Sequence, residues 1–407
     1  MRTRSAWFAA LAFLHVCMPA AAQTVLSESD VIARLSADSP RLRVIRSSVD
    51  VARAEVLAVG RWPNPRLNVD REAVAGVSEI LTTVLQPLPV TGRRNLERAS
   101  ASALVESSSR RADDQVRRAR ADLRLAYADL AVAQIREREL ARSRARLQEL
   151  ARILEKREAA GDAAGFDRLR VEREVLDLDA DRAIASADRA RAQVQLASFF
   201  APGVDASTLV VEERVVGASD VPGIDALVEQ AERTRGEIVA LQKEVESAQF
   251  AQQAADRRRI PEPEVIAGTK SSSLGSGDIG SVIGVQAVLP LFDRGKPERA
   301  LAEAKAAQAA ARLDALRVTL RAEVAAMRAA ALENRRAAQT YRESALKNTG
   351  DIERIAQVSY DAGERSILEL LDAFRTSSAA RVRQAALDAA AREAEIELEF
   401  VSGWEIP

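Results

Sequence analysis

The chain repeats one order of elements twice, with matching landmarks about 200 residues apart. In each copy, a proline-bounded segment leads into two strand-like runs, which a very long helical stretch and a glycine-marked turn then follow. The landmarks are Pro63, Leu88 and Gly161 in the first copy and Pro261, Leu291 and Gly363 in the second. Two matching halves that combine strands with helices far longer than a globular domain requires favour a conduit over a catalytic cleft.

The first 22 residues have the composition of a secretory signal peptide. Arg2 and Arg4 precede a short apolar run at residues 6–16, and small residues end at Ala22. We therefore predict cleavage before Gln23 and export of the remainder. Cys17 offers an alternative, lipidation, although no small residue directly precedes it.

Each repeat is expected to contain two strands and two long helices. Residues 23–200 form the first repeat, 201–223 a linker with a short strand at 209–216, and 224–407 the second repeat. The first repeat has a helix over 26–61, strands over about 66–88 and helices over 93–160 and 164–200. The second has strands over about 264–289 and helices over 298–360, with a brief break at Gly350, and 365–402. The segment 93–160 contains neither Gly nor Pro, so its helix would be roughly 100 Å long.

The number of strands predicts how the chains assemble. Lipid tolerates no open sheet edge, and a barrel of about eight strands fills its interior with side chains. Three chains would give roughly 12 strands and leave a passage. We therefore predict a mainly α chain whose four strands contribute to a 12-stranded trimeric membrane β-barrel. A long α-helical coiled-coil tunnel continues it. The alternative is that these runs are buried strands of a soluble domain.

Residue usage excludes several classes of function. The only His and the only Cys, His15 and Cys17, lie in the signal peptide, which removes catalytic triads, thiol nucleophiles and the usual zinc sites. The Ser-rich loop with Gly275 and Gly277 lacks the ending of a phosphate-binding loop. A formal charge of −1 does not suggest a nucleic-acid binder. We expect no enzyme, no cofactor and no metal site.

The order and duplication of these landmarks resemble the TolC family of outer-membrane efflux proteins. The segments that carry the resemblance are Trp62–Leu67, Gln86–Arg94, Leu289–Gly295 and Tyr360–Ala373. The Trp-Pro-Asn-Pro form of the first segment resembles the heavy-metal, cobalt-zinc-cadmium type branch. The resemblance implies a homotrimer in the lipid of the outer membrane of a Gram-negative bacterium, extending into the periplasm.

The resemblance also implies partners and a passive role. A periplasmic adaptor, or membrane fusion, protein docks on the tips, and an inner-membrane transporter of the RND type drives export through the duct. The rival hypothesis is a soluble periplasmic coiled-coil or adaptor-type scaffold, but such proteins usually present one hairpin rather than two in tandem. The residues do not indicate the exported substrate.

The second glycine turn is followed by two acidic residues on one helix face, Glu369 and Asp372, which are three residues apart. Three copies around an axis would form two carboxylate rings, a cation-selective constriction. The alternative is a solvated acidic face. The resemblance places both residues at the family's periplasmic gate and implies a latch in which Tyr360 and Arg365 face Asp167.

Adaptor docking is expected at the two turns and their apolar neighbours. The predicted docking residues are Gly161, Gly165, Phe166, Gly363, Ile367 and Leu368. The alternative role of the apolar ones is to pack the hairpin tips, and both roles remain open from the sequence.

Overall fold

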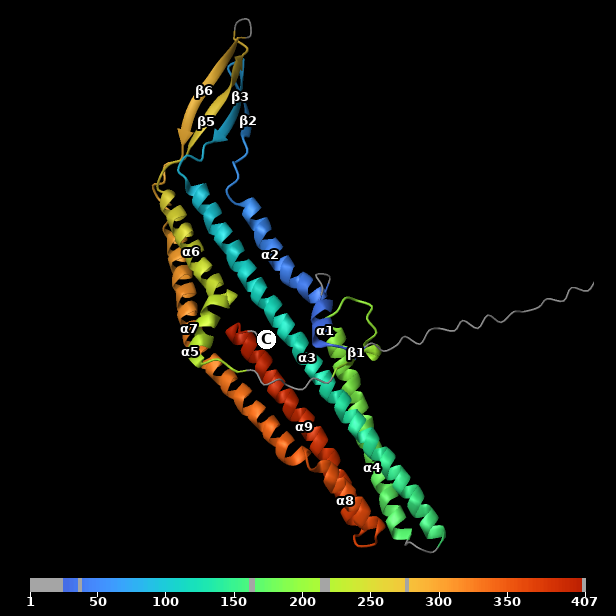
Figure 1. The fold of residues 1–407 in the computed structure, drawn as a ribbon. Coiled ribbons are helices and arrows are strands. Elements are labelled where there is room, and N and C mark those ends of the chain that lie inside the picture. The colour runs from blue at the N-terminus through green and yellow to red at the C-terminus, as the bar shows by residue number, and fades with distance from the viewer. Residues whose placement is uncertain (1–24, 36–38, 161–164, 213–219, 275–277, 405–407) are drawn as a thin grey trace, which may run out of the picture.

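The computed structural model describes residues 25–35, 39–160, 165–212, 220–274 and 278–404. The signal peptide with Cys17, the turn residue Gly161, and the loop residues Gly275 and Gly277 lie outside the described residues. The molecule is elongated, with a β-sheet at one end and two helical hairpin tips at the other (Figure 1).

One four-stranded antiparallel sheet combines strands of both repeats. Its strands are β2 (Arg66–Val74), β3 (Val77–Pro87), β5 (Pro263–Ser272) and β6 (Ile279–Ala287), in the order β2-β3-β5-β6. The repeats meet where β3 pairs with β5, with Leu85 opposite Ile266. Gly268 of β5 lies so close to the backbone of β3 at Thr82 that a side chain there would collide with it. Within the described chain, β2 and β6 form the two edges of this sheet.

Long helices form the body below the sheet. They are α3 (Arg93–Ala159), α4 (Gly165–Ala197), α6 (Gly236–Arg257), α7 (Lys296–Tyr341) and α9 (Ile367–Ser402). α3 contains 67 residues and packs against α2 (Pro40–Ala58), α4, α6 and α9. Its buried positions include Leu123, Leu130, Leu147 and Leu154, two pairs that each have the seven-residue spacing of a coiled coil.

No helix among the described residues is both long and apolar enough to cross a membrane.

The helix expected over residues 26–61 is wrong, because the structure divides it into α1 (Glu28–Arg34) and α2 (Pro40–Ala58). Ser27 begins α1 with a capping box that includes Asp30. Pro40 occupies the first turn of α2, where its missing N–H and fixed φ favour a helix start.

The break expected at Gly350 is also misplaced. α7 runs into a π-helical turn, η2 (Arg342–Leu346), before α8 (Thr349–Asp361) begins, so Gly350 lies inside α8. Thr349 donates its hydroxyl hydrogen bond to the Ala345 carbonyl at 3.0 Å. The interruption is therefore an extra residue within a helical turn and not a glycine effect.

The middle of the molecule contains a small two-stranded element, of which the sequence indicated only the second strand. β1 (Val25–Leu26) pairs in parallel with β4 (Val210–Val211), next to the short helix η1 (Ala206–Thr208). The strand expected over 209–216 is limited to β4 in the described chain, and residues 213–219 lie outside it. α5 (Ile224–Thr234) then leads into the second repeat.

Candidate functional site

The end of the molecule opposite the sheet, which we call the hairpin end, consists of the two hairpin tips (Figure 1). It comprises the C-terminal part of α3, the start of α4, all of α8 and the start of α9. These helices share one apolar cluster, which includes Leu154 of α3, Val171 of α4, Ala356 of α8 and Leu370 of α9. The two hairpins of one chain are therefore packed together, although they are about 200 residues apart in sequence.

The α8–α9 turn depends on Gly363. Its φ is 73°, a backbone conformation that is strained for any residue with a side chain. Its N–H donates to the Tyr360 carbonyl at 3.0 Å, and the Glu364 N–H donates to the Ser359 carbonyl at 2.9 Å. These bonds satisfy carbonyls at the end of α8 and return the chain directly into α9.

Glu369 begins the exposed acidic face of α9. Its carboxylate accepts from the Ser366 N–H at 3.0 Å and forms a capping box. It also pairs with Arg365 at 3.2 Å, and both side chains are 50% exposed. Asp372 is exposed one turn later, whereas Leu370 and Leu371 face the core. The structure therefore places the two predicted ring acids on one solvent-facing side.

Tyr360 and Asp167 lie close enough to interact electrostatically. Burial raises the pKa of Tyr360 above 10.0, and the negative charge of Asp167 raises it further, whereas Arg157 acts in the opposite direction. The hydroxyl therefore stays protonated at neutral pH and can donate a hydrogen bond. Arg157, which the sequence did not single out, lies 3.8 Å from Asp361.

Arg365, the third predicted latch residue, precedes α9 and pairs with Glu369 in its first turn rather than with Asp167 in this chain. The structure thus places Tyr360 within electrostatic range of Asp167, and pairs Arg365 with Glu369.

The predicted docking residues differ in accessibility. Phe166 is 65% exposed and Leu368 is 44% exposed. Ile367 is only 4% exposed and packs in the apolar cluster of the hairpin end, which supports its alternative role of packing the tip, and its docking role stays a prediction. Gly165 faces Glu158, and a Cβ there would collide with that carboxylate.

Ion pairs between the hairpins continue above the tips, and sequence reasoning missed them. Glu353 of α8 is paired with Arg146 of α3 at 2.7 Å and with Arg381 of α9 at 3.0 Å. Arg375 of α9 pairs with the buried Glu174 of α4. No short sequence spacing relates these residues: the pairs of Arg146 and Arg375 join helices from opposite repeats, and that of Arg381 joins two helices of the second repeat.

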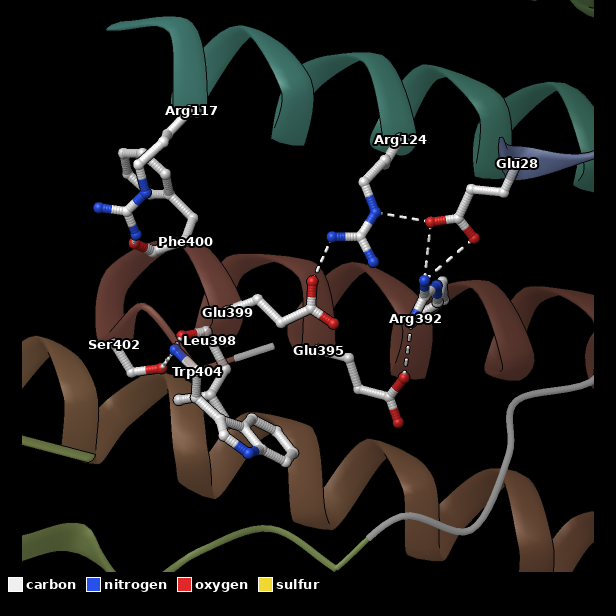
Figure 2. Close-up of polar contacts among 10 residues, drawn as sticks. All are labelled: Glu28, Arg117, Arg124, Arg392, Glu395, Leu398, Glu399, Phe400, Ser402 and Trp404. Atoms are coloured by element: carbon white, nitrogen blue, oxygen red, sulfur yellow. Dashed lines mark hydrogen bonds and ion pairs between the residues drawn. The ribbon is translucent and has the colours of Figure 1, made fainter. Parts of the chain in front are cut away.

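A second group of charges lies at the middle of the molecule, and we call it the central ion network: Glu28, Arg124, Arg335, Arg392, Glu395 and Glu399. Figure 2 shows five of these residues between α1, α3 and α9. Glu28 pairs with Arg124 at 2.6 Å and with Arg392 at 2.8 Å. Arg124 also contacts Glu399, and Arg392 pairs with Glu395 at 3.2 Å. Arg335 of α7 pairs with Glu395.

Within this network, Glu28 is held as a carboxylate. Burial alone raises the pKa of Glu28. The charges and hydrogen bonds of Arg392 and Arg124 more than offset this effect and hold the pKa of Glu28 below 4.5. The network thus fastens the start of α1 to α3 and α9.

No metal-ligand constellation is present at either place. Among the residues that the structure describes, no group of three or more His, Cys, Asp or Glu side chains is arranged to hold a metal ion.

A family model matches the second repeat of the chain. The family model described as "Outer membrane efflux protein" matches residues 227–403, which begin in α5 and end after α9. The second repeat of the chain therefore matches the outer membrane efflux protein family. No match was found among curated proteins.

Solved structures share the fold of this chain over nearly its whole length. A membrane protein from Pseudomonas aeruginosa is 20% identical, with a TM-score of 0.77 over 92% of this chain and 93% of that one. The outer membrane protein VceC of Vibrio cholerae is 17% identical, with a TM-score of 0.75 over 92% and 96%. The open state of the MtrE outer membrane channel of Neisseria gonorrhoeae is 15% identical, with a TM-score of 0.71 over 92% and 88%.

Proposed function

We propose that three copies of this chain form a passive outer-membrane duct, which receives substrate from a periplasmic adaptor and an inner-membrane transporter. The single observation that carries this proposal is an open sheet with two unpaired edges, joined to a helical body that the efflux family shares. Sheet edges in lipid must be paired. Pairing β2 of one copy with β6 of the next satisfies both edges and closes a ring of roughly 12 strands around a passage.

The two faces of the sheet differ in polarity, as a barrel wall requires. The strand register places Leu67, Val84, Ala267 and Ile283 in one row across one face. Leu67 and Ile283 are 66% and 85% exposed in the single chain. Asn68 and Thr83 lie opposite each other on the other face. Side chains alternate between faces along a strand, so the apolar face suits lipid and the polar face a water-filled lumen.

The hairpin end is the periplasmic gate in this proposal. Glu369 and Asp372 from three copies would line a cation-selective constriction. Tyr360 with Asp167, and Arg365, would hold the tips closed until an adaptor binds. Phe166, Leu368 and the turn at Gly363 are the accessible docking positions. This arrangement performs no chemistry and needs no cofactor.

The partners follow from the family and are part of the proposal. A membrane fusion protein would dock on the hairpin end, and an RND transporter would supply the driving force. The Trp-Pro-Asn-Pro segment at residues 62–65 favours the heavy-metal branch. A soluble adaptor-type scaffold does not fit, because it would leave the apolar face of the sheet in water.

The test is fractionation followed by conductance. The protein should remain in outer membranes after a salt wash, be extracted by detergent as a trimer and form ion-conducting channels in planar bilayers. Recovery as free periplasmic protein, or a trimer without conductance, would contradict the duct.

A further inference from the structure

Basic residues are concentrated where the four strands meet the helices. Four segments converge there: 57–62 after α2, 91–98 at the start of α3, 256–262 after α6, and 292–299 at the start of α7. They contain ten basic and five acidic residues, a net charge of +5 in a chain whose formal charge is −1. Residues from all four segments line one open hollow, so the segments form a contiguous surface, which we call the basic collar.

The collar lies directly next to exposed apolar side chains. Those between the strands and the helices are Trp62, Val90, Val288, Leu289, Leu291 and Phe292, which are 62% to 100% exposed. Phe292 is fully exposed, and Arg294 follows it two residues later. A band of apolar and aromatic side chains bordered by cationic ones matches the boundary between hydrocarbon and headgroups.

Several collar cations have no acidic partner in the described chain. Arg257, Arg294 and Lys296 are exposed and form no ion pair with any residue that the structure describes. Arg93, by contrast, is held by Glu97 and Glu262. The unpaired cations are therefore available to an external anion.

The placement of the cations opposes local helix electrostatics. α3 begins with Arg93 and Arg94 and has no acidic residue in its first turn. α7 begins with Lys296, although Glu298 also lies in its first turn. Cations at a helix N-terminus are disfavoured by the helix dipole, whereas anions there are stabilised. Both helix starts would therefore gain from an anionic layer beside them.

We propose that the basic collar binds the anionic phospholipid headgroups of the inner leaflet of the membrane, and thereby sets how deeply the sheet lies. The inference rests on the proposed membrane position of the sheet. The strands contain 9 to 11 residues, the length that crosses a bilayer at a tilt. Their lower ends therefore lie at headgroup level, where the collar begins.

The experiment compares lipid preference of the detergent-purified trimer. The collar variant carries Arg257→Gln, Arg294→Gln and Lys296→Gln. The control carries Arg170→Gln, Arg312→Gln and Lys347→Gln, three exposed cations on the helical body. Each protein is mixed with phosphatidylcholine vesicles that contain or lack phosphatidylglycerol, and the inserted fraction is measured by flotation and by quenching of tryptophan fluorescence with brominated lipid.

The parent and the control should prefer the anionic vesicles, and the collar variant should lose about tenfold or more of that preference. High salt should remove the preference of the parent. Equal preference in the collar variant and the parent, or an equal loss in the control, would overturn the proposal. Competition by inorganic phosphate at matched ionic strength would also overturn it, in favour of a discrete phosphate site.

The outcome separates this proposal from the proposed function. If the duct is wrong, the parent will neither insert into nor conduct through vesicles of either composition. If only the collar is wrong, the parent will insert and conduct without any preference for phosphatidylglycerol.

Discussion

The central ion network and the hairpin end use the same residue types, Arg and carboxylates, in opposite surroundings. In the network, the side chains of Glu28 and Arg392 are 10% and 14% exposed. At the hairpin end, those of Arg365 and Glu369 are both 50% exposed. Buried charges that lose a partner are strongly destabilising, whereas exposed pairs contribute little. The comparison indicates a fixed joint in the middle and a releasable contact at the tip.

The largest expected effect comes from Arg392→Met. Arg392 pairs with both Glu28 and Glu395, so its loss leaves two buried carboxylates poorly compensated. We expect a loss of about 3–5 kcal/mol in the free energy of unfolding, measured by far-ultraviolet circular dichroism in denaturant.

The network also offers a control with a neighbouring residue pair. Arg335 is 17% exposed and pairs with the buried Glu395, whereas Arg336 is 75% exposed and pairs with the exposed Glu333. Arg335→Met should destabilise and Arg336→Met should not. Equal effects would mean that burial does not distinguish the two regions.

The second effect is the dependence of stability on acid. The pKa of Glu28 in the folded chain lies below its ordinary value of 4.5. The stabilisation that ionised Glu28 contributes is therefore complete above pH 4.5 and is lost as the pH falls through the pKa of Glu28 in the folded chain. Glu28→Gln should lower the melting temperature at neutral pH and reduce its further decline below pH 4.5. A parallel acid decline in parent and variant would assign the acid sensitivity to other carboxylates.

The third effect tests the tip. Asp167→Asn with Tyr360→Phe should raise single-channel conductance, because each link near the wet tip is worth about 1 kcal/mol and its loss favours the open state. Adding Arg365→Ser should raise conductance further. The melting temperature should stay near that of the parent. A stability loss comparable with that of Arg392→Met, without added conductance, would make the tip a second fixed joint.

The smallest effect concerns ion selectivity. Glu369→Gln with Asp372→Asn should weaken cation preference and block by multivalent cations, measured by reversal potentials in salt gradients. The Gln side chain can still accept from the Ser366 N–H and retain the α9 cap, so folding is preserved. Unchanged selectivity would mean that both residues belong to a solvated acidic face and do not line a constriction.

The sequence determined the repeated order of elements because local chemistry marks it. Prolines bound the strands, alternating residues mark their faces, and long Gly- and Pro-free segments form α3 and most of α7. The same local signals predicted the turn at Gly363, whose positive φ the structure shows. Local signals did not predict that the helix expected over residues 26–61 is two helices, one that begins after Ser27 and one that begins at Pro40. They also did not predict that η2 follows α7.

Only the tertiary structure decided which charges are paired and which are accessible. Glu28 and Arg392 are separated by most of the chain and meet because α1 and α9 both pack against α3, which brings the start of α1 beside α9 (Figure 2). The burial of Ile367 likewise depends on how the hairpins pack, whereas the pairing of Arg365 with Glu369 is local, four residues apart. Sequence spacing specifies which face of a helix a residue occupies, but the position of the neighbouring helix specifies whether that face meets water, a core or an opposite charge.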